Sequence, residues 1–156
     1  MKISHLSNID FEEVPVWFPV CINKDCPRKD ECLRYQATSA LPAGHKTLFC
    51  IAPSQWESDG CPHFEEIRTV RMARGFSKLF DQVLQKHAAK LREDITSVLH
   101  GTRIYYECRD GKRLITPEEQ EDMRQLVKRR GYAWEVPFDA YEEHILYTET
   151  LSAKVF

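Results

Sequence analysis

Five of the six cysteines lie in one part of the chain, and this cluster limits what the chain can fold into more than any other feature. The sixth, Cys108, lies far downstream. Scattered structural thiols do not gather in this way, whereas the ligands of a metal site do. The clustered cysteines are Cys21, Cys26, Cys32, Cys50 and Cys61.

The N-terminal sequence predicts a compartment in which these cysteines stay reduced. Asp10, Glu12 and Glu13 stand where a signal peptide has its apolar stretch. No apolar run approaches the ~18–20 residues that span a bilayer. We therefore expect a cytoplasmic protein without a membrane partner, in which disulfides are rare and a metal site accounts better for the cluster.

The stretch CINKDCPRKDECLRYQ places three cysteines with four and five residues between them. Because proline suits the first position of a helix, Cys26 before Pro27 is expected at a helix N-cap, where backbone N–H groups stabilise a thiolate. Closed zinc and iron–sulfur sites need a fourth ligand. The turn SDGCPHF favours Cys61 as that ligand, ahead of Cys50 in the β-prone run TLFCIAP and then His63.

The preferred ligand set therefore consists of four thiolates. Zinc is the commoner occupant of a small closed site of this kind, so we expect Zn²⁺ in a structural role. A [4Fe–4S] cluster is the alternative, since four thiolates serve either group. The expected ligands are Cys21, Cys26, Cys32 and Cys61.

Charge is distributed unevenly along the chain, although the formal net charge is only −2. Residues 1–66 carry 6 Lys and Arg against 10 Asp and Glu, and residues 132–156 carry 1 against 5. Between them, residues 67–131 carry 15 against 9. A basic middle of this kind indicates an anionic partner such as duplex DNA, and a merely solvated helical surface is the alternative interpretation.

Apolar periodicity predicts that this basic middle is mainly helical. From Phe76 to Leu99, apolar residues recur every three or four positions, as in one long amphipathic helix or in two with a bend near His87. A final helix is expected over TPEEQEDMRQLVKRRG. There Thr116 is a good N-cap, proline takes the first position, Glu119 completes a capping box and a glycine ends the helix.

The segment GTRIYYECRDGKRLI between these helices is ambiguous. Its strand-forming residues and its Asp–Gly pair are typical of a β-hairpin, which would form a basic wing. Its place after a helix and a short glycine turn instead favours the second helix of a repressor-like helix-turn-helix, which reads the major groove. In the helical interpretation of residues 102–116, the side chains expected to face DNA are Arg103, Tyr106, Arg109, Lys112 and Arg113.

The pattern CINKDCPRKDECLRY…GCPHF, followed by FSKLF…GTRIYYECRDGKRLITPEEQEDMRQL, resembles a family of small uncharacterised bacterial proteins. The resemblance covers most of the chain, from Val16 to Tyr147. It implies cysteines at the four preferred ligand positions and a hydrophobic residue in place of Cys50, which supports Cys61 as the fourth ligand. The family has no assigned activity, so the resemblance implies a grouping and not a function.

Together these patterns predict a mixed, mainly α protein. A Cys-rich, metal-stapled module is expected over residues 1–66, and a helical, helix-turn-helix-like basic domain with an acidic aromatic C-terminal arm over residues 67–156. We expect a nucleic-acid-binding or transcription-associated regulator, with a protein-interaction adaptor or an iron–sulfur redox sensor as alternatives. The sequence contains no Gly-rich phosphate loop, HExxH motif or nucleophile elbow, so no catalytic residue is expected.

Overall fold

The computed structural model describes residues 9–57 and 59–148 and divides the chain into two compact units. Of the described residues, 9–57, 59–68 and 145–148 form one unit, and Thr69–His144 form the other. Residues 145–148 therefore belong with the cysteine-containing unit and not with the helices. Among the described residues, no helix is long and apolar enough to cross a membrane.

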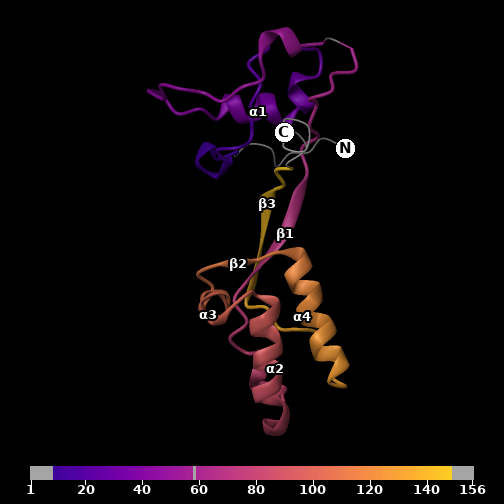
Figure 1. Cartoon of the computed structure of the whole chain (residues 1–156). Coiled ribbons are helices and arrows are strands. Elements are labelled where there is room, and N and C mark those ends of the chain that lie inside the picture. The colour runs from indigo at the N-terminus through magenta and orange to yellow at the C-terminus, as the bar shows by residue number, and fades with distance from the viewer. Residues whose placement is uncertain (1–8, 58, 149–156) are drawn as a thin grey trace. The chain divides into compact units, whose positions relative to one another are not determined.

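The first unit is built around one short helix, α1 (Leu33–Ser39), shown in Figure 1. Leu33 and Ala37, one helical turn apart, face the same side and are fully buried with Phe18 and Val20. Isolated bridges join the neighbouring segments: Val20 pairs with Cys50, and Cys32 with Glu66. Short 3₁₀ helices complete the unit at Phe11–Glu13, Lys29–Glu31 and Pro53–Gln55.

The second unit contains a three-stranded antiparallel sheet in the order β2-β1-β3. Its strands are β1 (Thr69–Arg74), β2 (Leu114–Ile115) and β3 (Ala140–Ile145). In the β1–β2 pair, Ala73 lies opposite Ile115. Both strands that pair with β1 are far from it in the sequence, so long-range contacts and not a local hairpin hold the sheet together.

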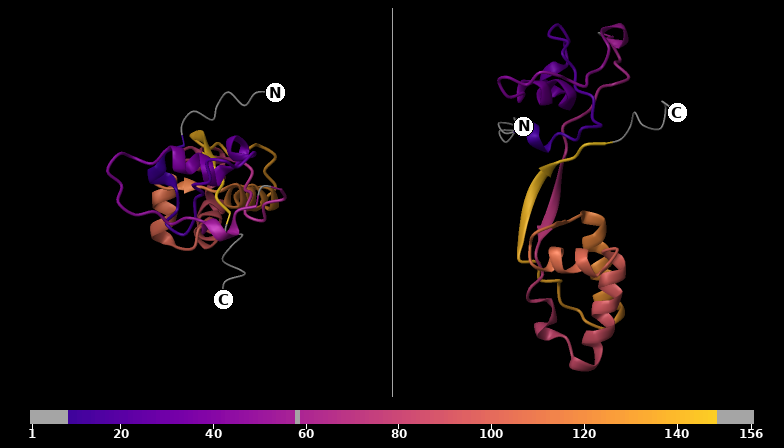
Figure 2. Two further views of the ribbon diagram at one scale, coloured as in Figure 1. Left: turned by 90° about the horizontal axis from the view of Figure 1, so that it is seen from above. Right: turned by 60° about the vertical axis from the view of Figure 1, so that its left-hand side comes forward.

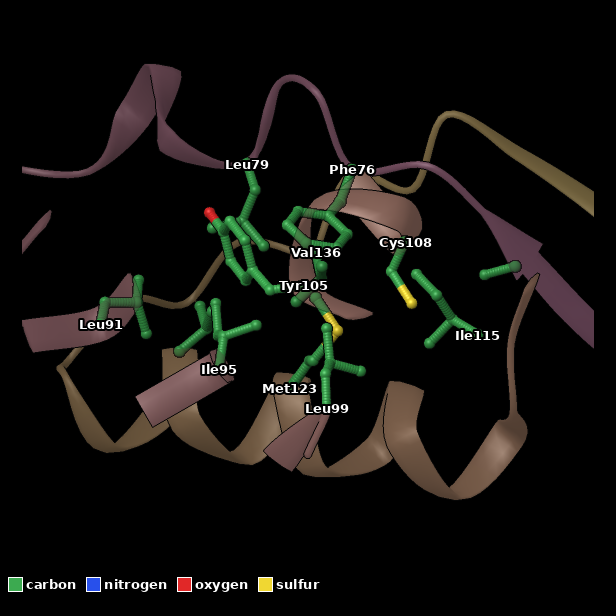
Figure 3. Close-up of a cluster of buried hydrophobic side chains, with 12 residues drawn as sticks. Phe76, Leu79, Leu91, Ile95, Leu99, Tyr105, Cys108, Ile115, Met123 and Val136 are labelled. Atoms are coloured by element: carbon green, nitrogen blue, oxygen red, sulfur yellow. The ribbon is translucent and has the colours of Figure 1, made fainter. Parts of the chain in front are cut away.

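Three helices pack beside this sheet, as the right-hand view in Figure 2 shows. They are α2 (Gln85–Val98), α3 (Thr102–Arg109) and α4 (Pro117–Arg129). Figure 3 shows their buried side chains pointing toward one another, with Leu99, the C-cap residue of α2, beside Met123 of α4, and Tyr105 of α3 near Phe76. The Phe76 and Tyr105 rings meet edge to face, with centroids 5.4 Å apart.

The predicted fold class, a mainly α protein with a metal-stapled module, is wrong. The chain is 40% helix and 13% strand, and the second unit contains a three-stranded sheet beside its helices. Within residues 9–57 and 59–148, no group of three or more His, Cys, Asp or Glu side chains stands in position to hold a metal ion. The protein is therefore a mixed α/β protein.

Two expected helix boundaries also differ from the structure. The first helix begins at Leu33 with Cys32 as its N-cap, and not after Cys26, because residues 27–31 form turns and a 3₁₀ helix. The helix expected from Phe76 begins only at Gln85. The apolar side chains of the preceding segment still reach the core, but from a loop and a 3₁₀ helix at Leu79–Gln82.

Candidate functional site

Four cysteines of the first unit line one small cavity of about 30 Å³. They come from three segments of the chain: the turn before α1, the N-cap of α1, and the turn near residue 61. The exposed lining is far more apolar than polar. The four are Cys21, Cys26, Cys32 and Cys61, the same set that the sequence favours as ligands.

Helix α1 positions two of these cysteines. Cys32 is its buried N-cap residue. Two hydrogen bonds hold Cys21 against the helix. The Cys21 N–H donates to the Arg34 carbonyl at 3.0 Å, and the Thr38 hydroxyl donates to the Cys21 carbonyl at 2.8 Å. These bonds hold Cys21 close to the helix of which Cys32 is the N-cap.

Turns carry the other two cysteines to the cavity. The Cys26 N–H donates to the Asn23 carbonyl at 3.4 Å, and the Phe64 N–H donates to the Cys61 carbonyl at 3.2 Å. Gly60, just before Cys61, has a φ of 66°, in the left-handed region where glycine is favoured. This glycine allows the chain to turn so that Cys61 faces back toward the other thiols.

Arg34 holds the separate segments of this site together. It is 2% exposed, and its guanidinium donates to the His63 carbonyl and to the Pro19 carbonyl, each at 2.8 Å. It also lies 3.6 Å from the Glu65 carboxylate and 4.4 Å from the centre of the Phe18 ring. The sequence alone does not show that this arginine is buried, so its role in joining the segments was not predicted.

The four thiols are near enough to influence one another's ionisation. Burial raises the pKa of the Cys21 thiol, a hydrogen bond from the Asn23 backbone lowers it, and Cys32, Cys26 and Cys61 each raise it further. Burial lowers the pKa of Arg34, while Glu65 and three of the thiols act in the opposite direction. The cavity is thus a place where several thiolates can form only with a nearby positive charge.

Two side chains of the same cavity wall leave buried nitrogen atoms without a partner. They are the indole N–H of Trp56 and both ring nitrogens of His63. A buried polar group without a hydrogen bond costs roughly 1–3 kcal/mol, so such atoms are rare unless a site uses them. The sequence ranks His63 only third as a ligand, and no spacing signal marks Trp56.

Cys50, the second choice for the fourth ligand, does not line the cavity. It pairs with Val20 and packs against the core of the first unit. As described above, the side chains do not converge on a single point that would hold an ion, although the four thiols share one cavity. The assignment of Cys61 to the ligand set stays a prediction, and the cavity favours it over Cys50.

The residues expected to contact DNA lie on α3 and in the turn that follows. Residues 102–109 are helical, and no hairpin forms there. Arg103 pairs with Glu107 at 2.9 Å, and Arg109 pairs with Asp110 at 2.8 Å. Tyr106 is 44% exposed, and the Arg109 guanidinium lies 4.8 Å from the centre of its ring. Neighbouring carboxylates therefore offset much of the positive charge on this surface.

Arg113 and Lys112 have different surroundings. Lys112 is exposed, whereas Arg113 makes a two-point contact with the Glu119 carboxylate, at 2.9 and 3.1 Å. Arg113 also donates to the sulfur of the buried Cys108 at 3.2 Å. This geometry gives Arg113 a structural role at the start of α4, and leaves Arg103, Tyr106, Arg109 and Lys112 as the surface residues of the predicted set.

A comparison with protein families finds one match, a family of unknown function (DUF6078), over residues 4–147. The chain belongs to this family. The expected grouping with uncharacterised proteins is thereby confirmed, and the DUF6078 match spans the whole cysteine cavity as well as the sheet and helices of the second unit. Among curated proteins and among solved structures, none matches the chain. The function of this DUF6078 member must therefore be argued from its own residues.

Proposed function

We propose that the protein binds one zinc ion through the thiolates of four cysteines. One observation carries the proposal: cysteines from three separate segments line a single cavity. The ligands are Cys21, Cys26, Cys32 and Cys61. Soft thiolate donors in a set of four suit zinc better than the hard cations magnesium and calcium, which bind oxygen ligands.

The cavity has room for a single ion among the four thiols. Its volume of about 30 Å³, counted as the space open to the centre of a water-sized sphere, exceeds the roughly 10–15 Å³ that one water molecule needs. Zinc is preferred to an iron–sulfur cluster because it is the commoner occupant of a small closed four-thiolate site. Binding of one ion requires that the cysteine side chains rotate toward a common centre, and their backbones are already held around the cavity by α1 and two turns.

Positive side chains near the cavity offset the charge of the thiolates. Arg34 is buried beside it, and Arg28 and Lys29 also line it. Four thiolates with one Zn²⁺ carry a net charge of −2, which is costly in an apolar surrounding without nearby cations. These three residues therefore support a charged thiolate complex over a cavity of neutral thiols.

Serine variants test the ligand set. We expect serine at Cys21, Cys26, Cys32 or Cys61 to lower the zinc content well below one ion per chain, because an alcohol is a much poorer zinc ligand than a thiolate. Cys50→Ser and Cys108→Ser are the matched controls and should retain the full zinc content. A Cys61→Ser protein that keeps its zinc would show that the fourth ligand is another residue.

A second candidate function is nucleic-acid binding by the surface of α3. The observation that favours it is the exposed Tyr106, stacked with Arg109 and near the exposed Lys112. Aromatic and cationic side chains on one surface suit stacking on bases and contact with phosphates. In this proposal the protein is a regulator that carries zinc in one unit and contacts nucleic acid with the other.

A further inference from the structure

We infer that Trp56 and His63 donate N–H hydrogen bonds to the cysteine sulfurs once these carry a metal ion. This inference rests on the proposed zinc function and names the residues that tune it. Its basis is that both side chains line the thiol cavity and both leave buried nitrogens without a partner. They would act beside the metal ligands, as positioning residues, and not as ligands themselves.

Trp56 carries the argument most directly, because an indole can only donate. Its Nε1–H cannot ligate a metal and cannot accept a hydrogen bond. It follows the 3₁₀ helix Pro53–Gln55, and its backbone N–H is bonded to the Pro53 carbonyl at 3.1 Å, which fixes where the side chain begins. The acceptors that line the cavity are the four sulfur atoms together with the side chains of Asn23, Glu57 and Tyr35.

The sulfur atoms become better hydrogen-bond acceptors when they bind a metal ion. A neutral thiol is a weak acceptor, whereas a thiolate bound to a metal keeps negative charge and accepts strongly. The buried N–H donors of the cavity wall therefore suit sulfurs that carry negative charge.

The second N–H donor is the His63 side chain, and its backbone is anchored beside the cavity. Its carbonyl accepts the Arg34 Nε–H at 2.8 Å, so the ring is kept beside the cavity by a buried arginine. A neutral imidazole offers one N–H donor, and the four cysteines already complete the ligand set for zinc. Outer-shell donors of this kind orient the ligands and raise metal affinity.

Cobalt(II) titration of the whole chain tests the inference, because cobalt reports its ligands in its visible spectrum. We expect Trp56→Phe and His63→Ala each to weaken cobalt binding by roughly 10–100-fold, with the ligand-field bands of a four-sulfur site unchanged. His63→Gln keeps an N–H donor and should restore most of the affinity. Trp17→Phe and His45→Ala, in the same unit but away from the cavity, should bind as the wild type does.

The outcomes separate this inference from the proposed function. A wild-type chain that binds no cobalt overturns the zinc proposal itself. Wild-type affinity in both Trp56→Phe and His63→Ala overturns the inference alone. A shift of the ligand-field bands in His63→Ala shows that His63 is a ligand, which also overturns it.

A measurement on the wild-type chain covers the case in which a variant fails to fold. In protein loaded with cadmium-113, a hydrogen bond from an indole N–H to a cadmium-bound sulfur couples the proton to the metal nucleus. We expect this coupling at the Trp56 indole proton and none at the Trp17 indole proton. No coupling at Trp56 in a fully loaded sample would contradict the inference.

Discussion

At the scale of single residues, Arg34 matters most for the first unit. Its guanidinium joins three segments through two backbone carbonyls and a carboxylate, all in a buried setting. A lysine could not replace it, because a single ammonium group cannot reproduce the planar fork of donors. The turn that carries Cys61 lies against α1 because Arg34, a residue of α1, donates to the nearby His63 carbonyl.

Replacing Arg34 by Met should destabilise the first unit by about 3–5 kcal/mol, since it removes two hydrogen bonds and leaves the buried Glu65 carboxylate beside an apolar side chain. Denaturant unfolding followed by tryptophan fluorescence measures this loss of stability in a Trp134→Phe background. The two remaining tryptophans, Trp17 and Trp56, both lie in the first unit. The matched control is Arg28→Met, an exposed arginine that stacks on Phe64 and should cost less than about 1 kcal/mol. Equal losses in the two variants would show that Arg34 does not hold the segments together.

Glu119 has the corresponding position in the second unit. Burial alone would raise its pKa, but hydrogen bonds from Arg113 and from the Thr116 backbone outweigh it, so the pKa lies below its ordinary value of 4.5. A carboxylate with a lowered pKa stabilises the fold above its ordinary pKa. That contribution is lost as the pH falls through the folded value, because the unfolded chain then binds more protons.

We therefore expect Glu119→Gln to lower the free energy of unfolding by about 1.5–3 kcal/mol at neutral pH. The difference from the wild type should shrink steadily as the pH falls below 4.5. Thermal unfolding followed by helix circular dichroism between neutral and acid pH measures both. Glu118→Gln, an exposed neighbour in the same first turn, is the control and should change stability by less than about 0.5 kcal/mol. A pH-independent Glu119→Gln effect would rule out the charge as its cause.

At the scale of elements, local signals predicted α4 and could not predict the sheet. The capping box of Thr116 and Glu119 is confirmed, with Pro117 at the first position and Gly131 just past the end. These contacts lie within a few residues, so the sequence contains them. The strands β1 and β3 depend on partners about 40–70 residues away, and the apolar periodicity near Phe76 serves packing from a loop, which helical spacing alone cannot reveal.

The candidate site shows the same limit. Local sequence favoured Cys21, Cys26, Cys32 and Cys61, and these four line one cavity, although the helix N-cap is Cys32 and not Cys26 as expected. Their role as ligands stays a prediction. No local sequence pattern predicted that Arg34 is buried or that Arg113 binds Glu119, because both contacts depend on how separate segments pack. Two of the five residues expected to face DNA are paired with acidic neighbours on α3 or just after it, and a third is held by α4.

The α3 surface makes a specific prediction for DNA binding. With Arg113 held by Glu119, up to three cations remain for phosphate: Arg103, Arg109 and Lys112. Each contact contributes about −0.9 to the slope of log affinity against log salt, so we expect a slope of about −2.7 for duplex DNA. Alanine at both Arg109 and Lys112 should weaken binding and flatten the slope by about 1.8.

Lys90→Ala is the control for this test, because Lys90 lies on α2 and outside the predicted set of DNA-contacting residues. It removes one positive charge from the same unit and should leave the slope unchanged. Fluorescence anisotropy across a salt series gives the slope. No binding at ~50 mM salt, where phosphate attraction is strong, would eliminate the nucleic-acid proposal and favour the adaptor alternative.

At the scale of the whole molecule, the described residues form two hydrophobic cores that share no residue. One is built from Phe18, Val20, Leu33 and Ala37 of the first unit, and the other from the helices and sheet of the second. The thiol cavity belongs wholly to the first unit, and the predicted nucleic-acid surface wholly to the second. The sixth cysteine, Cys108, is 0% exposed in the second core, and burial raises the pKa of its thiol, so it takes no part in the cavity.

The metal content of the intact chain, purified without oxygen and without added metal, tests the central claim most directly. We expect a colourless protein with one zinc per chain. Alkylation should then spare Cys21, Cys26, Cys32 and Cys61 until a chelator is added, since bound thiolates are protected. A chain with no metal and four freely alkylated thiols would contradict the account. Brown protein with iron and acid-labile sulfide would contradict it equally, and would favour the redox-sensor alternative.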